Sequence, residues 1–327
     1  MVGYPIGVVG GWSHHLWRLE TDAGSFAVKE LVPATSSWWA ERLEDAIQLE
    51  QAAWAAGTVP MAEPIPVAGS GWLVGAVLLR GHEHRYRCHR WVEGTPCMEL
   101  SPSEAASASV GAGVAAIAAL GLDGGTSTSC AASDALNAYE ATVAEAKRQG
   151  AGWADELDRL KPLVEELRAD LADLAGRAEP LLIMHRDVDP KNASMRADGA
   201  VALFDWDYSG PVLPGAELLG AALSFARRGG GAEPLHRAGR PQVNEAYLAA
   251  TLDAYERVAG HLPDMTGAAA PRVEEGFRWL MLNARRALGW EPATPDQAKR
   301  AEPVVTSMCS DWPRGAAAVR AWASRIA

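Results

Sequence analysis

Apolar and polar positions alternate near the N-terminus of the chain, and apolar positions take a helical spacing further along. Residues 7–31 hold two alternating segments around a glycine-containing turn, which predicts hairpins. Residues 67–80 follow as further strands around a Gly-Ser-Gly turn. Between them, residues 38–56 place their apolar side chains on or beside one helical face. The first part of the chain is therefore predicted to combine strands with one helix.

The remainder of the chain is predicted to be mostly helical. Ser101-Pro102-Ser103-Glu104 is a capping box with proline in the first turn, so a helix should begin there and end near Gly121. Residues 121–133, rich in Gly, Ser and Thr, are expected to form a mobile loop, and 227–240 an exposed one. Further helices are expected as a pair within 134–177, broken near 149–152, and then at 243–258, 272–288 and 313–325.

Composition and charge exclude several classes of protein. The 327 residues are 48% hydrophobic and 22% charged, which is typical of a globular chain with two domains or lobes. A net charge of −11 argues against nucleic acid as a partner, because phosphates demand a basic surface. The four cysteines are isolated, and the sequence shows neither a signal peptide nor an apolar run long enough for a membrane span. A cytoplasmic protein is expected, with neither a membrane nor a nucleic acid as its partner.

Candidate chemistry is concentrated in two short segments that each follow an apolar run. The first is the loop from His185 to Asn192, which carries Asp187, and the second begins at Asp205 and includes Asp207. Phosphoryl transfer needs hard oxygen ligands for Mg²⁺ and a carboxylate that orients the attacking hydroxyl. The spacing lets one loop present Asp187 to a hydroxyl acceptor, while Asn192 and Asp205 hold the metal.

This pair of motifs resembles the protein-kinase-like superfamily, and most closely its aminoglycoside phosphotransferase and choline kinase branch. In that branch a glycine often precedes the catalytic aspartate, whereas this chain has Arg186. The branch also has an aspartate that braces the catalytic loop, at the position of Glu217 here. The resemblance implies an α+β fold of two lobes: a nucleotide-binding lobe over residues 1–92 with a small antiparallel sheet, and a larger, mostly helical catalytic and substrate-binding lobe over 93–327.

The resemblance also implies a nucleotide site between the lobes. Lys29, in an otherwise apolar strand, is expected to contact the α- and β-phosphates and to pair with Glu50, with Glu44 as the alternative partner. His89 would take the gatekeeper position before the hinge between the lobes. The other residues expected to contact the nucleotide are Gly10, Gly11 and Ser13 in the glycine-rich hairpin and the backbone of Arg90 and Val92 at the hinge.

Together these features predict an ATP- and Mg²⁺-dependent kinase that phosphorylates a hydroxyl of a small molecule. GTP is the alternative nucleotide. The acceptor is expected to be an aminoglycoside or other antibiotic, with a role in resistance, or else a sugar or amino alcohol; the acidic net charge slightly favours a cationic one. A catalytically silent nucleotide-binding regulator is the alternative from another class. Candidates for an acidic acceptor pocket are Asp253, Glu256, Glu274, Glu275 and Asp311, and Trp279 and Trp290 are candidates for stacking or for the core.

Overall fold

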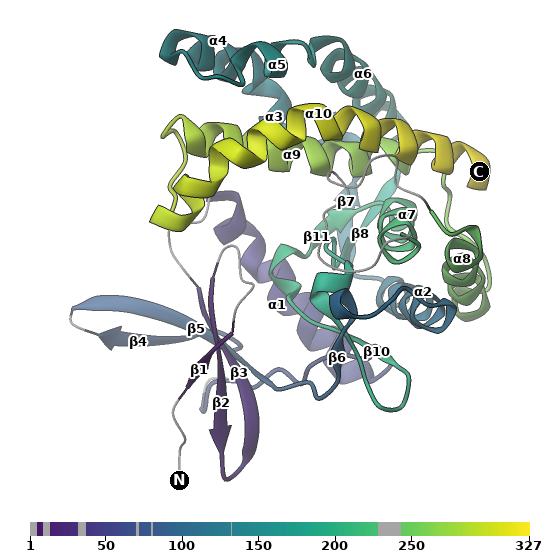
Figure 1. Ribbon diagram of the computed structural model, residues 1–327. Coiled ribbons are helices and arrows are strands. Elements are labelled where there is room, and N and C mark those ends of the chain that lie inside the picture. The colour runs from purple at the N-terminus through teal and green to yellow at the C-terminus, as the bar shows by residue number, and fades with distance from the viewer. Residues whose placement is uncertain are drawn as a thin grey trace.

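A small antiparallel sheet and a larger helical part make up the chain (Figure 1). The computed structural model describes residues 5–8, 14–31, 37–69, 72–79, 81–131, 133–227 and 243–327. Within these residues no helix has both the length and the apolar character that a membrane span requires. This mixed α+β architecture confirms the fold class predicted from the sequence.

The N-terminal sheet has the strand order β1-β2-β3-β5-β4, and every pairing is antiparallel. Lys29 on β3 lies directly opposite Arg87 on β5, so the two side chains share one face of the sheet. Helix α1 contacts β8, η4 and β11, which lie next to the candidate catalytic residues. The bounds are β1 Ile6–Gly7, β2 His15–Thr21, β3 Gly24–Leu31, α1 Ser37–Ala56, β4 Gly75–Leu79 and β5 His82–Arg90.

Two small sheets, β10-β9-β6 and β11-β8-β7, lie within the helical part and carry the loops that hold the candidate catalytic residues. Helices α2, α7 and α8 pack together beside them, and α9 and α10 run side by side (Figure 1). The bounds are β6 Thr95–Pro96, η1 Cys97–Glu99, α2 Glu104–Ala118, β7 Asp123–Thr126, η2 Ser127–Ala131, α3 Asp134–Asn137, α4 Tyr139–Gln149, α5 Ala154–Asp158, α6 Lys161–Arg177, β8 Pro180–Met184, η3 Pro190–Asn192, β9 Ala193–Met195, β10 Val201–Leu203, η4 Trp206–Tyr208, β11 Gly210–Val212, α7 Pro214–Phe225, α8 Glu245–Ala259, α9 Ala269–Ala287 and α10 Pro295–Ile326.

The last helix begins much earlier than the sequence analysis predicted. It starts at Pro295, not at Pro313, and continues through Pro303 and Pro313 to Ile326. Thr294 accepts a hydrogen bond from the backbone of Gln297, whose side chain accepts one from Thr294 in return. This capping box marks the true start. Treating a proline as a helix boundary failed because α10 packs along α9, and tertiary packing outweighs the local cost of proline.

The predicted loop at residues 121–133 was also wrong, because strand β7 and the turn η2 lie within it. Gly124 explains the unexpected strand. A Cβ at this position would lie 3.0–3.1 Å from backbone atoms of Leu181 and Leu182, so glycine allows β7 to approach β8 closely. At Gly124, glycine therefore serves close backbone packing.

Candidate active site

The loop between β8 and β9 is held by a buried histidine. His185 is fully buried, and its Nε2 lies 3.2 Å from the carbonyl oxygen of Phe204. The backbone N–H of Asp187 donates to His185 Nδ1 at 3.3 Å. Burial lowers the pKa of His185 to about 4, so the ring is neutral, with Nε2 as donor and Nδ1 as acceptor. This ring therefore connects the loop that carries Asp187 to the strand end that precedes Asp205.

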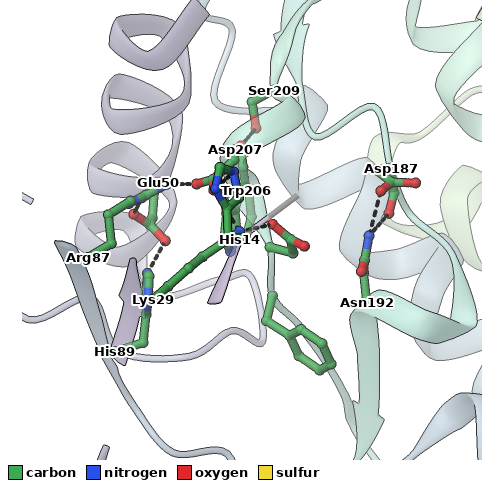
Figure 2. Close-up of polar contacts among 12 residues, drawn as sticks. His14, Lys29, Glu50, Arg87, His89, Asp187, Asn192, Trp206, Asp207 and Ser209 are labelled. Atoms are coloured by element: carbon green, nitrogen blue, oxygen red, sulfur yellow. Dashed lines mark hydrogen bonds and ion pairs between the residues drawn. The ribbon is translucent and has the colours of Figure 1, made fainter. Parts of the chain in front are cut away.

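Asp187 and Asn192 lie together within this loop, as the sequence spacing predicted (Figure 2). Asn192 Nδ2 donates to Asp187 Oδ2 at 2.7 Å and to the Asp187 carbonyl at 3.0 Å. The ammonium of Lys191 lies 3.0 Å from Asp187 Oδ1. Burial raises the pKa of Asp187 to about 6, and Lys191 opposes that rise. A carboxylate with this pKa is suited to accept a proton near neutral pH.

Glu217 on α7 braces the same loop from behind. Its Oε1 accepts a hydrogen bond of 2.9 Å from the backbone N–H of Arg186. Arg186 has a φ of +64°, a left-handed conformation that glycine adopts most easily. The longer glutamate therefore performs the bracing that the sequence left open for this position. Burial raises the pKa of Glu217 to about 8, so this carboxyl is mostly protonated at neutral pH.

Lys29 reaches the segment after β10, where Asp205 and Asp207 lie. Its Nζ is 2.5 Å from Asp205 Oδ1 and 2.6 Å from Asp207 Oδ2. Burial would raise the pKa of Asp207, but the charges of Lys29 and Arg87 outweigh it and hold that pKa well below its usual range. For Lys29, burial alone would lower the pKa, but the charges of the two carboxylates outweigh burial and raise it.

The predicted pairing of Lys29 with Glu50 is not what the structure shows. Glu50 is fully buried and pairs instead with Arg87 and with His89, whose Nε2 lies 2.7 Å from Glu50 Oε1. The Arg87 guanidinium also contacts Asp207, so it connects α1 to the segment after β10 (Figure 2). Arg87 could not be recognised from the sequence, since no motif marks it and Arg85, two residues earlier on the same strand, is also an arginine but is exposed in the structure.

The remaining nucleotide candidates lie partly outside the described residues. Gly10, Gly11 and Ser13 are among these undescribed positions. At the hinge, the N–H of Arg90 donates to the carbonyl of Glu63 at 2.8 Å. Val92 follows within two residues, after the last strand of the sheet. The backbone therefore passes from the sheet toward the helical part at the place where the adenine contacts were predicted.

The side chains predicted to hold the metal fit Mg²⁺ by their chemistry. The amide N–H of Asn192 donates to Asp187, so the Oδ1 of Asn192 points away from that carboxylate. Asp205 adopts a left-handed φ of +66° and keeps 44% of its side chain exposed. Its low pKa, which Lys29 supports against burial, keeps it ionised. An amide oxygen and a carboxylate are hard ligands of the kind that Mg²⁺ prefers.

A small pocket that is open to solvent lies beside Asp187. Of the acidic residues predicted for the acceptor, only Glu275 lines it. Glu274 is buried and bonded to Ser133 and Arg278, and Asp311 is bonded to Ser307 and Arg314. The pocket is also lined by Asp189, Arg186, Glu217 and Arg272.

A family model described as the phosphotransferase enzyme family matches residues 6–261, more than half of the chain. The chain belongs to this phosphotransferase family. The match spans the Lys29 strand, the Asp187 loop, the Asp205 segment and the Glu217 helix. The chain is accordingly a phosphotransferase that acts on a hydroxyl group of a small molecule. No curated protein sequence matches it significantly.

Solved structures of small-molecule kinases share the fold at low sequence identity. A spectinomycin phosphotransferase in complex with ADP and spectinomycin is 11% identical, with a TM-score of 0.65 over 98% of this chain and 94% of that one. An amicoumacin kinase in complex with AMP-PNP, Ca²⁺ and its antibiotic is 13% identical, with a TM-score of 0.60 over 95% and 91%. An aminopropanol kinase associated with a microcompartment is 13% identical, with a TM-score of 0.54 over 97% and 93%. The likeness extends over nearly the whole chain.

Proposed function

We propose that this phosphotransferase uses ATP and Mg²⁺ to phosphorylate a hydroxyl of a small acceptor. The observation that carries the proposal is the convergence of two segments. The loop with Asp187 and Asn192 is connected by the His185–Phe204 contact to the segment that begins at Asp205, and Lys29 on β3 reaches Asp205 from the sheet. These residue types supply the functions that phosphoryl transfer needs, namely a base, metal ligands and a phosphate-binding cation.

Asp187 would orient the acceptor hydroxyl and accept its proton as the bond to phosphorus forms. Lys191 and Asn192 hold both carboxylate oxygens, which restricts the carboxylate to one orientation. Asn192 and Asp205 would hold Mg²⁺, which would neutralise charge on the phosphates when bound. Lys29 would exchange part of its contact with the two aspartates for the phosphates of the nucleotide.

The nucleotide would lie between the sheet and the helical part, near the boundary proposed after residue 92. There the backbone of Arg90 and Val92 would contact the base, and Gly10, Gly11 and Ser13 would lie over the phosphates. The complexes with ADP and AMP-PNP formed by similar structures favour an adenine nucleotide over GTP. The similar structures are kinases of the antibiotics spectinomycin and amicoumacin and of the amino alcohol aminopropanol, so antibiotics, with a role in resistance, and metabolites are both candidate acceptor classes.

A first experiment separates nucleotide binding from turnover. ATP with Mg²⁺ should raise the melting temperature of wild type and of Asp187→Asn alike, because Asp187 lies on the acceptor side. ADP release should be stimulated by one member of a panel of hydroxylated antibiotics, sugars and amino alcohols in the wild type. That stimulation should fall about 10²–10⁴-fold in Asp187→Asn. Failure of both ATP and GTP to bind would defeat the proposed function, and binding without turnover on any acceptor would favour the regulator.

A further inference from the structure

Four cations lie in or beside the pocket next to Asp187, although the whole chain carries a net charge of −11. Arg186 from the catalytic loop and Arg272 from α9 both line it. Two more cations stand at its edge: Lys191 next to Asp187, and Arg227, whose Nη2 lies 4.0 Å from Asp189 Oδ2. The cations are thus concentrated at the place where the acceptor must bind.

The carboxyl groups of the pocket do not outweigh these cations. Asp187, Asp189 and Glu275 carry negative charge when ionised. Glu217 also lines the pocket, but its raised pKa of about 8 leaves it mostly neutral near pH 7. A cationic acceptor such as an aminoglycoside would therefore meet a surface that is not acidic, unlike the surface of the chain as a whole.

One internal carboxylate already occupies the space between the two lining arginines. Glu275 Oε1 lies 3.4 Å from Arg186 Nη2, and its other oxygen accepts from Arg272. Arg186 and Arg272 are therefore spaced so that one carboxylate can contact both, and in this structure that carboxylate is Glu275. Arginine presents a planar fork of donors that suits carboxylate or phosphate.

Arg186 retains hydrogen-bonding capacity that no described residue meets. Only 6% of the residue is exposed, and its Nε and Nη1 are buried without a hydrogen-bond partner among the described residues. Its guanidinium lies 4.7 Å from the centre of the Tyr208 ring, which fixes its plane. Buried guanidinium donors without acceptors are costly, and an anionic group supplied by a ligand would satisfy them.

Arg272 is placed by the small residue opposite it. A Cβ on Gly220 of α7 would lie 3.0 Å from Arg272 Nε, so glycine leaves room for the guanidinium to lie against the helix. Arg272 keeps 22% of its side chain exposed, at the side of the pocket formed by α7 and α9. It can reach a ligand, while Arg186 forms the wall behind.

We propose that the acceptor of this kinase carries an anionic group, a carboxylate or a phosphate, which Arg272 and Arg186 bind while its hydroxyl faces Asp187. This inference rests on the proposed function, since it names the acceptor class of the same site. It differs from the expectation of a cationic acceptor that the net charge suggested.

Matched pairs of acceptors test the charge directly. ADP release is measured with hydroxy acids beside their methyl esters, with sugar phosphates beside the free sugars, and with aminoglycosides and amino alcohols. An anionic compound should be the best acceptor, and neutralising its anion should lower kcat/KM about 10–100-fold, the loss expected for hydrogen bonds to a charged group. Comparison of the hydroxy acids with the sugar phosphates identifies which anion is bound. If no anionic compound stimulates release, or if neutral or cationic compounds do as well, the inference is overturned.

Variants on α9 locate the effect. Arg272→Met should raise KM for the anionic acceptor about 10–100-fold, with kcat and the ATP-induced rise in melting temperature little changed. Arg272→Lys, which keeps the charge, should recover part of the loss and serves if the methionine variant is unstable. Arg278→Met is the matched control, because Arg278 lies on the same helix and pairs with Glu274 but does not line the pocket. An unchanged KM in both Arg272 variants would contradict the assignment.

The outcomes separate this inference from the proposed function. Turnover with a cationic acceptor alone overturns the anionic acceptor but leaves the kinase intact. Absence of nucleotide binding in the same preparations counts against the kinase itself.

Discussion

Arg87→Met removes the guanidinium that connects the small sheet to Asp207, in the segment after β10. Arg87 is 1% exposed and contacts the carboxylates of Glu50, which is fully buried, and Asp207. Methionine is long and apolar enough to fill much of the space, so the main effect is two buried carboxylates that each lose a partner. Removing one member of a buried ion pair typically costs about 3–5 kcal/mol.

The structure favours the lower end of that range. Glu50 keeps its contact with His89, and Asp207 keeps its contact with Lys29, so neither carboxylate is left alone. We expect the free energy of unfolding to fall by about 3 kcal/mol. Urea denaturation followed by tryptophan fluorescence measures it, since the chain has 13 tryptophans. Arg85→Met is the control: Arg85 is exposed on the same strand, and its loss should change stability by less than about 0.5 kcal/mol.

A double-mutant cycle with Glu50→Gln tests the reasoning behind the magnitude. If the cost arises from a stranded charge, Arg87→Met should cost less when Glu50 is already the neutral glutamine, with a coupling of about 1–3 kcal/mol. Additive losses, or an Arg87→Met variant as stable as the Arg85→Met control, would refute the account of this network.

Three further substitutions probe the same site. Lys191→Met removes the cation that opposes the rise of the Asp187 pKa, which is about 6 in the wild type. The acid limb of the kcat/KM profile should therefore move to higher pH, while the alkaline plateau is kept. An unmoved limb would mean that another group sets it. The pKa of Glu217 is about 8 when folded and about 4.3 when unfolded, so the folded chain binds the extra proton and stability falls as pH rises between these values. Glu217→Gln should remove that slope. At pH 9 the variant should be more stable than the wild type by a few kcal/mol, at about 1.4 kcal/mol per pKa unit, as measured by urea denaturation at pH 5 and 9. If the stabilities of the two proteins change in parallel with pH, Glu217 is not a buried neutral carboxyl. Lys29→Met should weaken the ATP-induced rise in melting temperature and lower turnover, whereas a full thermal response would show that Lys29 does not reach the phosphates.

The sequence predicted the parts of the site that depend on short-range spacing. Asp187 and Asn192 lie five residues apart, so their place on one loop was predictable from the motif, whereas the hydrogen bond between them was not. The β2–β3 hairpin and helices α1, α2, α8 and α9 were predicted for the same reason, because alternation and helical period are local signals. Helix α7 was not predicted, and the pair of helices expected in 134–177 is four helices in the structure.

What the sequence could not show depends on pairings across the fold. Whether Lys29 meets Glu50 or Asp207 is decided by the register of β3 against β5, which places Arg87 opposite Lys29 and within reach of Glu50. Arg85 and Arg87 look alike in the sequence, yet Arg85 is exposed, whereas Arg87 is buried because it contacts Glu50 on α1 and Asp207. The two arginines of the pocket beside Asp187 likewise come from α9 and from the loop after β8, which are far apart in sequence.

The most direct test of the central claim is transfer of the phosphoryl group itself. Wild type and Asp187→Asn, both shown to bind ATP by thermal shift, are incubated with Mg²⁺, ATP and the acceptor found in the panel, and the acceptor is analysed by mass spectrometry. The account predicts an acceptor that gains one phosphoryl group with the wild type, and a rate about 10²–10⁴-fold lower with Asp187→Asn. Equal rates of phosphorylation by the two proteins would contradict the assignment of Asp187 as the residue that receives the proton of the acceptor hydroxyl.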